Sequence, residues 1–143
     1  MSSHPVGLLD TSTVILLSRL RDPEALPDAP LISAITLAEL SVGPLVARSD
    51  AERAARVAHL QQAEADFEAL PFDADAARAF GQVAAALRRA GRKSSARAYD
   101  AMIAAVAIAN ELPLYTCNPH DFTGIDRLEV IAIAHPDSES SRA

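Results

Sequence analysis

Short apolar runs alternate with longer amphipathic or alanine-rich stretches along this chain. The runs are too short to form helices and are rich in Leu, Ile and Val, so they predict buried strands. We expect strands at 6–9, 31–34, 114–117 and 128–133, and a short edge strand at 69–72 that contains Pro71.

Helices are predicted between the strands, because residues that cap helices precede the alanine-rich stretches. The expected helices are, in order, one at 13–21 capped by Thr11 or Ser12, one that runs from a capping box of Thr36 and Glu39 toward Leu45, one capped by Asp50 that reaches about residue 68, one at 74–90 between Asp73 and Gly91, and one that opens at Ser94 or Ser95 and ends before Pro113.

Strands that alternate with helices are typical of an α/β fold. We therefore expect a central, mainly parallel sheet covered by helices. The chain has 143 residues, no internal repeat and no linker, which indicates a single domain at 1–143. The polar segment at 135–143 is expected to be a flexible tail.

Composition narrows the possible functions. The apolar run at 101–109 is far shorter than the roughly 20 residues that span a bilayer, so we expect a soluble cytoplasmic protein with no membrane contact. The lone Cys117 excludes an internal disulfide. A net charge of −6 argues against binding nucleic acid through bulk charge. It still allows a local basic patch, or a nuclease whose acids hold metal ions.

Acidic residues follow two of the predicted strands and lie in two of the predicted helix starts, where a ligand or metal site is expected. Asp10 follows the first strand, and a turn at 118–121 follows the fourth. Ligands of open α/β sheets bind beyond the carboxyl ends of the strands. Glu39 and Asp100 lie in otherwise apolar helix starts, where an unpaired carboxylate is costly to bury. Hard oxygen ligands suit Mg²⁺ or Mn²⁺, and one such ion or a pair could activate water and hold a phosphate.

Four segments carry a family pattern: Leu-Leu-Asp-Thr-Ser at 8–12, Thr-Leu-Ala-Glu-Leu at 36–40, Asp100 with Ile-Ala-Ala at 103–105, and Thr-Cys-Asn-Pro-His-Asp-Phe at 116–122. In this order they resemble the PIN-domain ribonucleases, and most closely the VapC-type toxins of bacterial toxin–antitoxin pairs. The resemblance implies a PIN-like three-layer fold and a Mg²⁺- or Mn²⁺-dependent endoribonuclease that cleaves RNA. It also implies a homodimer and inhibition by a cognate antitoxin in a hetero-oligomer.

The same resemblance assigns roles to individual residues. Asp10, Glu39 and Asp100 are the expected metal-binding, catalytic acids. The fourth is expected to be Asp121, with Asn118 as a further polar contributor. Thr11, Ser12 and Thr116 are expected to orient these carboxylates or a bound water.

A basic segment precedes Asp100 and is expected to contact the RNA backbone. It holds five of the 13 basic residues, namely Arg88, Arg89, Arg92, Lys93 and Arg97.

Each acid also has an ordinary structural explanation. Asp10 could cap a helix, Glu39 could complete the capping box, and Asp100 could pair with Arg97. Two other functions fit parts of the pattern. A phosphoacceptor signalling module gathers acids at strand ends, but it needs paired acids near the first strand and a Lys near the last strand. A non-catalytic interaction domain with the same fold would be favoured by the missing acid at Asn118.

Overall fold

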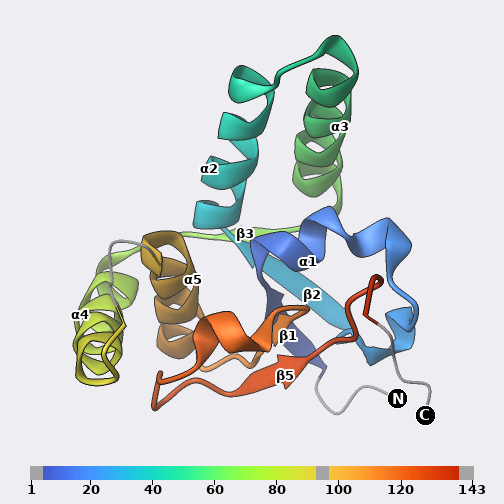
Figure 1. The fold of residues 1–143 in the computed structure, drawn as a ribbon. Helices are drawn as coiled ribbons and strands as arrows, with labels where there is room; N and C mark the ends of the chain where they lie inside the picture. The colour runs from blue at the N-terminus through green and yellow to red at the C-terminus, as the bar shows by residue number, and fades with distance from the viewer. Residues whose placement is uncertain (1–4, 93–96, 139–143) are drawn as a thin grey trace.

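A parallel sheet forms the centre of the molecule (Figure 1). The computed structural model describes residues 5–92 and 97–138. Their helices and strands are β1 (Val6–Leu9), α1 (Thr11–Ile15), β2 (Ala29–Ser33), α2 (Ala34–Val42), α3 (Asp50–Asp66), β3 (Ala69–Leu70), α4 (Ala74–Arg89), α5 (Ala98–Ala109), β4 (Leu114–Thr116) and β5 (Val130–Ala132), with short 3-10 helices η1 (Leu17–Arg19), η2 (Pro23–Ala25), η3 (Gly43–Val46) and η5 (Pro119–Phe122).

The strand order is β3-β2-β1-β4-β5, and every pairing is parallel. The expected helix-covered, mainly parallel α/β sheet is therefore confirmed. Among the described strands, β3 pairs only with β2, in agreement with the expected edge strand. Parallel strands all point the same way, so β1 and β4 deliver the residues that follow them to one edge of the sheet.

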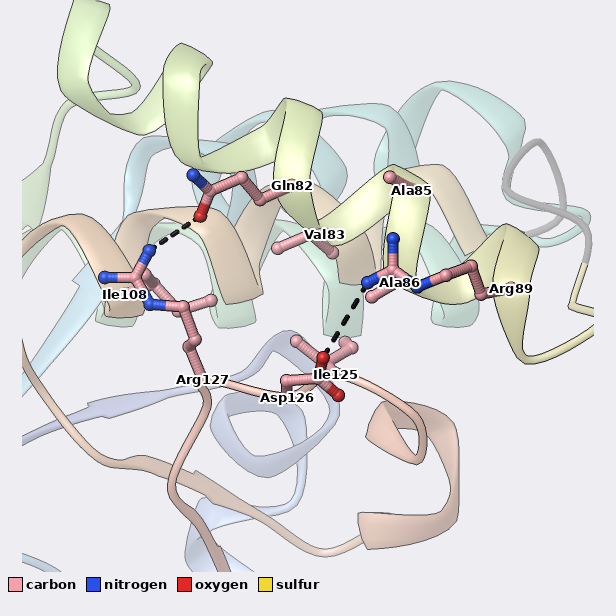
Figure 2. A pocket seen from close by; sticks show the side chains of 9 residues that line it. All are labelled: Gln82, Val83, Ala85, Ala86, Arg89, Ile108, Ile125, Asp126 and Arg127. Carbon is pink, nitrogen blue, oxygen red and sulfur yellow. Dashed lines mark hydrogen bonds and ion pairs between the residues drawn. The ribbon is translucent and has the colours of Figure 1, made fainter.

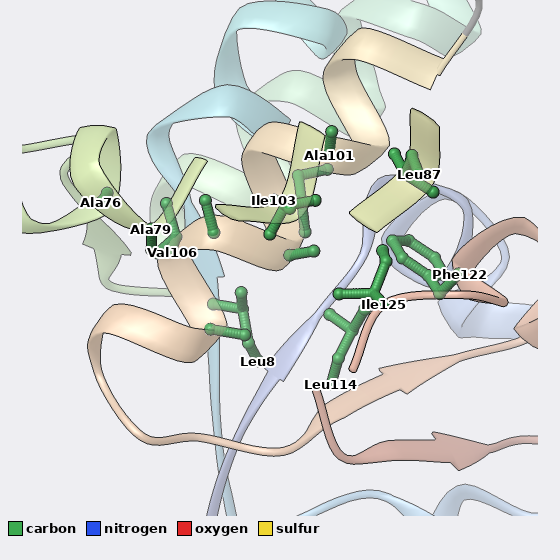
Figure 3. Close-up of a cluster of buried hydrophobic side chains, with 14 residues drawn as sticks. Leu8, Ala76, Ala79, Leu87, Ala101, Ile103, Val106, Leu114, Phe122 and Ile125 are labelled. Carbon is green, nitrogen blue, oxygen red and sulfur yellow. The ribbon is translucent and has the colours of Figure 1, made fainter. Parts of the chain in front are cut away.

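Side chains of the central strands alternate between two cores, as the pleat of a strand requires. Leu8 and Leu114 face the first core, where α4 and α5 cover the sheet (Figure 3). Leu9 and Tyr115 face the second core, which α1, α2 and α3 help to cover. Gly7 is needed beside Tyr115, because a Cβ there would lie 2.4 Å from the tyrosine ring.

Three helix starts differ from the expectation, because side chains just before them provide the caps. Asp10 caps α1 by accepting from the backbone N–H of Thr13, so Thr11 and Ser12 were the wrong choices. Ser33 caps α2.

The early start of α2 rules out the expected capping box at Thr36 and leaves Glu39 in the middle of the helix. Ser49, rather than Asp50, caps α3 by accepting from the N–H of Glu52.

Element ends shift by a few residues elsewhere. The helix expected at 13–21 ends as α1 at Ile15 and continues as the separate turn η1, while the turn at 118–121 forms η5. The expected start of α5 at Ser94 or Ser95 lies outside the described residues.

The C-terminal segment is partly described. Residues 135–138 form a turn in which Asp137 accepts a 2.7 Å hydrogen bond from Arg19, and 139–143 lie outside the described part. Within the described residues, every helix is too short or too polar to cross a membrane.

Candidate active site

Asp10 anchors the site at the carboxyl end of β1, next to β4 in the sheet. Its carboxylate is buried, with 4% of the residue exposed. Oδ1 accepts from the N–H and hydroxyl of Thr13, at 3.1 and 2.5 Å. Oδ2 accepts from Thr116 at 2.7 Å and from Ser12 at 3.1 Å. Burial raises the pKa of Asp10, and these hydrogen bonds oppose the rise.

Glu39 reaches the site from α2. Thr11 donates a 2.5 Å hydrogen bond to its Oε1, and the Thr11 hydroxyl also lies 3.0 Å from that of Thr36. Burial raises the pKa of Glu39, the bond from Thr11 lowers it, and the charge of Asp10 adds to the rise. That repulsion places Glu39 and Asp10 within electrostatic reach of each other.

Asp100 lies in the first turn of α5 and interacts electrostatically with each of the other three predicted acids. Its pKa is raised to about 6, first by burial and then by the charges of Asp121, Asp10 and Glu39, while Arg97 lowers it. Four carboxylates from separate parts of the chain therefore share one electrostatic neighbourhood. The ordinary explanation of Asp100 as an ion-pair partner of Arg97 describes only part of its surroundings.

Asp121 is held by an arginine. It lies on η5, and its Oδ1 is 2.6 Å from Nη1 of Arg97, the residue just before α5. The same Nη1 is 3.8 Å from Oδ2 of Asp100. Arg97 therefore links the two carboxylates, with about a third of each of the three side chains exposed.

Asn118 belongs to the Asp10 side of the site. Its side-chain N–H donates to the Ser12 hydroxyl at 3.0 Å, and that hydroxyl donates to Asp10. Its backbone N–H donates to the Thr116 hydroxyl at 2.9 Å. The two candidates for the fourth position thus differ: Asn118 supports the groups that hold Asp10, and Asp121 faces Asp100.

The donors of this site fit a hard divalent cation in their chemistry. They are carboxylate oxygens whose mutual repulsion is only partly offset by one guanidinium. As they stand, however, no three acidic, histidine or cysteine side chains of the described residues are placed to hold a metal ion. The positive charge between Asp100 and Asp121 is that of Arg97.

The predicted basic segment is divided by the fold. Arg97 joins the acids, and Arg92 donates to the carbonyls of His120 within η5 and of Thr123 just after it. Arg88 and Arg89 lie at the end of α4, and Lys93 lies outside the described residues.

Arg89 lines a separate pocket between α4 and the 125–127 loop (Figure 2). There it approaches Asp126 at 3.7 Å, while Arg127 donates to Gln82 at 2.6 Å. None of the four candidate acids lines this pocket.

A groove beside Glu39 lies where α1 meets the hairpin of α2 and α3, which projects from the sheet in Figure 1. Its lining combines site residues with apolar and basic ones, namely Thr11, Ile15, Glu39, Leu40, Gly43, Arg56 and His59. Beyond Gly43, the tip of the hairpin exposes Leu45 and Val46, of which 85% and 60% are accessible. Exposed apolar residues next to a groove are typical of a surface that binds another protein.

Comparison with known families matches residues 8–128 to the PIN domain. This chain belongs to the PIN-domain family. This chain is 41% identical over 129 residues to Ribonuclease VapC5 of Mycobacterium tuberculosis, an alignment that covers 88% of this chain and 93% of that protein.

Two solved structures share the PIN fold. This chain matches a chain in the crystal structure of VapBC-5, a member of the VapBC family of toxin–antitoxin systems from Mycobacterium tuberculosis, with a TM-score of 0.77 and 37% sequence identity. The match covers 90% of this chain and 99% of that one. This chain also matches DNA-bound VapBC from Salmonella typhimurium with a TM-score of 0.69 and 26% identity, over 90% and 98%. The resemblance to VapC-type PIN domains is confirmed.

Two further residues of the PIN-domain site were not predicted from the sequence. Thr13 and Thr36 are fully buried and contact Asp10 and Thr11, respectively. Thr13 follows Asp10 by three residues, which is the spacing of a helix cap, so the local sequence carried a signal for it. Thr36 carried none, because its contact depends on how α1 and α2 meet.

Proposed function

We propose that this PIN domain is an endoribonuclease that cleaves RNA phosphodiester bonds with Mg²⁺ or Mn²⁺ and serves as the toxin of a type II toxin–antitoxin pair. The observation that carries the proposal is the convergence of four carboxylates, which together with burial raises the pKa of Asp100 to about 6. The related proteins VapC5 and VapC of Rickettsia bellii are ribonucleases, which supports the assignment.

Asp10, Glu39, Asp100 and Asp121 would hold the cation. When bound, it supplies a Lewis acid that makes water a stronger nucleophile and offsets charge on the phosphate. The chain contributes orientation: Thr13 and Thr116 fix the two oxygens of Asp10, and Thr11 fixes one oxygen of Glu39. Carboxylates held in this way need little rearrangement to bind a cation.

RNA would be held by arginines near the acids. Arg92 and Arg97 are the described members of the basic segment that contact η5, so a phosphate beside Asp121 lies within their reach. Arginine binds phosphate through paired N–H groups, and this local attraction works despite a net charge of −6. Arg88, Arg89 and Lys93 would extend the basic path along the RNA.

The antitoxin would occupy the groove beside Glu39 and cover the exposed tip of the hairpin. The structural relatives are VapBC toxin–antitoxin assemblies, which supports a protein partner. Glu39 lines the groove together with apolar Ile15 and Leu40, and exposed Leu45 follows two residues after Gly43, another lining residue. A partner segment with apolar residues and an arginine directed at the acids fits this surface. The homodimer remains a prediction from the family resemblance.

The main test is RNA cleavage by the purified protein in Mg²⁺, Mn²⁺ or EDTA. We expect cleavage that needs a divalent cation and falls at least about 100-fold in Asp10→Asn and Asp100→Asn. Asp75→Asn is the matched control, because Asp75 lies on the surface of α4 and pairs only with Arg78 in the described structure. Cleavage that persists in EDTA, or in both site variants, contradicts the proposal.

Inhibition is tested separately by titrating the cognate antitoxin into this assay. We expect cleavage to stop near stoichiometric antitoxin, and Leu45→Ser to raise the amount of antitoxin required about tenfold or more. Undiminished cleavage at saturating antitoxin would contradict the toxin assignment while leaving the nuclease assignment intact. If Leu45→Ser is inhibited like the wild type, the antitoxin does not use the tip of the hairpin.

A further inference from the structure

Arg97 occupies the place where the site most needs positive charge. Its Nη1 lies 2.6 Å from Asp121 and 3.8 Å from Asp100, so one guanidinium serves both carboxylates. Within the described residues, Asp10 and Glu39 have no ion pair, and their contacts are with hydroxyl and N–H donors. Arg97 is therefore the cationic side chain that contacts the carboxylates on this side of the site.

This arrangement opposes the binding of a metal ion. The oxygen of Asp121 that faces Arg97 already forms a short, charged hydrogen bond. An ion that takes up both Asp100 and Asp121 must move the guanidinium away from them, because like charges repel.

Phosphate is a suitable new partner for the displaced guanidinium. The Arg97 side chain is 31% exposed, so it can reach a ligand without unfolding its helix. The planar guanidinium of arginine matches phosphate oxygens as well as carboxylate oxygens. A phosphodiester bound beside Asp121 would therefore draw Arg97 away from the carboxylates.

We infer that Arg97 couples the binding of RNA to the binding of the metal ion by moving from Asp121 to an RNA phosphate. The inference rests on the proposed function and adds an order to it: the site takes up its cation strongly only when RNA is present. Coupling between two ligands is reciprocal, so the metal ion also strengthens RNA binding by the same factor. A factor of about ten is expected, within the usual range for coupled sites.

The experiment measures Mn²⁺ binding by calorimetry, with and without a short 2′-O-methyl oligonucleotide whose integrity is checked afterwards. In the wild type, the oligonucleotide should tighten Mn²⁺ binding about tenfold. In Arg97→Gln, Mn²⁺ alone should bind several-fold more tightly than in the wild type, and the oligonucleotide should tighten it much less. Arg78→Gln is the control for loss of one positive charge, because Arg78 pairs with Asp75 on the surface.

Two results would overturn the inference: Mn²⁺ binding by Arg97→Gln that is no tighter than by Arg78→Gln, or wild-type Mn²⁺ affinity that does not respond to the oligonucleotide. The second needs no variant, so it holds whatever Arg97→Gln does to folding. If the wild type still cleaves RNA with Mn²⁺, only the inference has failed. If it neither binds Mn²⁺ nor cleaves RNA, the proposed function has failed as well.

Discussion

Asp10 and Asp100 lie on two sides of one acidic site, and the fold holds them in different ways. Neutral donors surround Asp10: two threonines and a serine donate hydrogen bonds to both of its carboxylate oxygens. Asp100 is more exposed and faces other carboxylates and the guanidinium of Arg97. Neutral donors fix a carboxylate in place and leave its charge unbalanced, whereas an arginine balances the charge and can be exchanged for another cation. The Asp10 side therefore holds its carboxylate in a fixed position, whereas on the Asp100 side another cation can replace the guanidinium.

Beyond the losses expected for Asp10→Asn and Asp100→Asn, the next largest effect separates the two candidates for the fourth acid. Asp121→Asn should reduce metal-dependent RNA cleavage about 30- to 100-fold, because it removes a charged oxygen donor on the exchangeable side. Asn118→Ala should reduce it less than about tenfold, since Asn118 acts through Ser12. Initial rates at saturating Mn²⁺ measure both. A larger loss in Asn118→Ala would show that the fourth position belongs to the Asp10 side.

Stability should change in opposite directions on the two sides. Asp10→Ala removes the cap of α1 and leaves buried hydroxyl donors without an acceptor. The free energy of unfolding should therefore fall by about 1–2 kcal/mol, even though a costly buried charge is also removed. Asp100→Ala relieves repulsion and should leave stability at pH 7.5 unchanged or raise it by up to about 1 kcal/mol, after allowance for solvent screening. Urea denaturation in EDTA measures both.

The sign of the Asp100 effect depends on pH. Because the folded pKa of Asp100 is raised to about 6, its favourable contribution is complete below its ordinary value of 3.8 and is lost as pH rises through about 6. Any gain from Asp100→Ala should therefore shrink at pH 4.5. Destabilisation by both alanine variants to the same extent would remove the distinction between the two sides.

Metal binding should follow the same titration. Protons compete with the cation for Asp100, so at subsaturating Mn²⁺ the cleavage rate should rise with pH and fall up to about tenfold per pH unit below 6. Saturating Mn²⁺ should move the midpoint of the profile below 6. Rates measured from pH 5 to 7.5, with RNA integrity controls, test this. A flat profile at low Mn²⁺ would argue against Asp100 as a ligand.

The smallest expected effect concerns Glu39. Thr11→Val removes the 2.5 Å hydrogen bond to Glu39 but keeps the side-chain shape, so cleavage should fall only about three- to tenfold. Ser41→Ala is a suitable control, because Ser41 also lies on α2 and bonds only to the backbone of its own helix in the described structure. If Thr11→Val matches Ser41→Ala in rate, Thr11 does not position Glu39.

Much of the fold could be predicted from local sequence patterns, because short apolar runs between alanine-rich stretches leave few alternatives to a parallel sheet. Helix starts were less accessible. Ser33 is both the last residue of β2 and the cap of α2. Three residues farther on, Thr36 and Glu39 have the spacing of a capping box but do not form one. The cap at Asp10 was considered from the sequence, but only as an alternative to a role in the site, whereas the structure gives this residue contacts typical of both.

The site was less predictable than the fold, because its contacts join distant segments. The sequence suggested Arg97 as a partner for RNA or for Asp100, three residues away. Its shorter contact is with Asp121, 24 residues away, and depends on how η5 packs against α5. The same reason explains why Thr36 was missed. Spacing along one helix can be read from sequence, but a meeting of two elements cannot.

The position of β4 has a consequence for the timing of synthesis. This strand lies between β1 and β5, yet it comes near the end of the chain, and its Thr116 supplies one of the bonds to Asp10. A ribosome releases residues from the N-terminus first. A nascent chain that has exposed Asp10 and Glu39 therefore still lacks half of its site. The acidic site can therefore be completed only after most of the polypeptide has emerged.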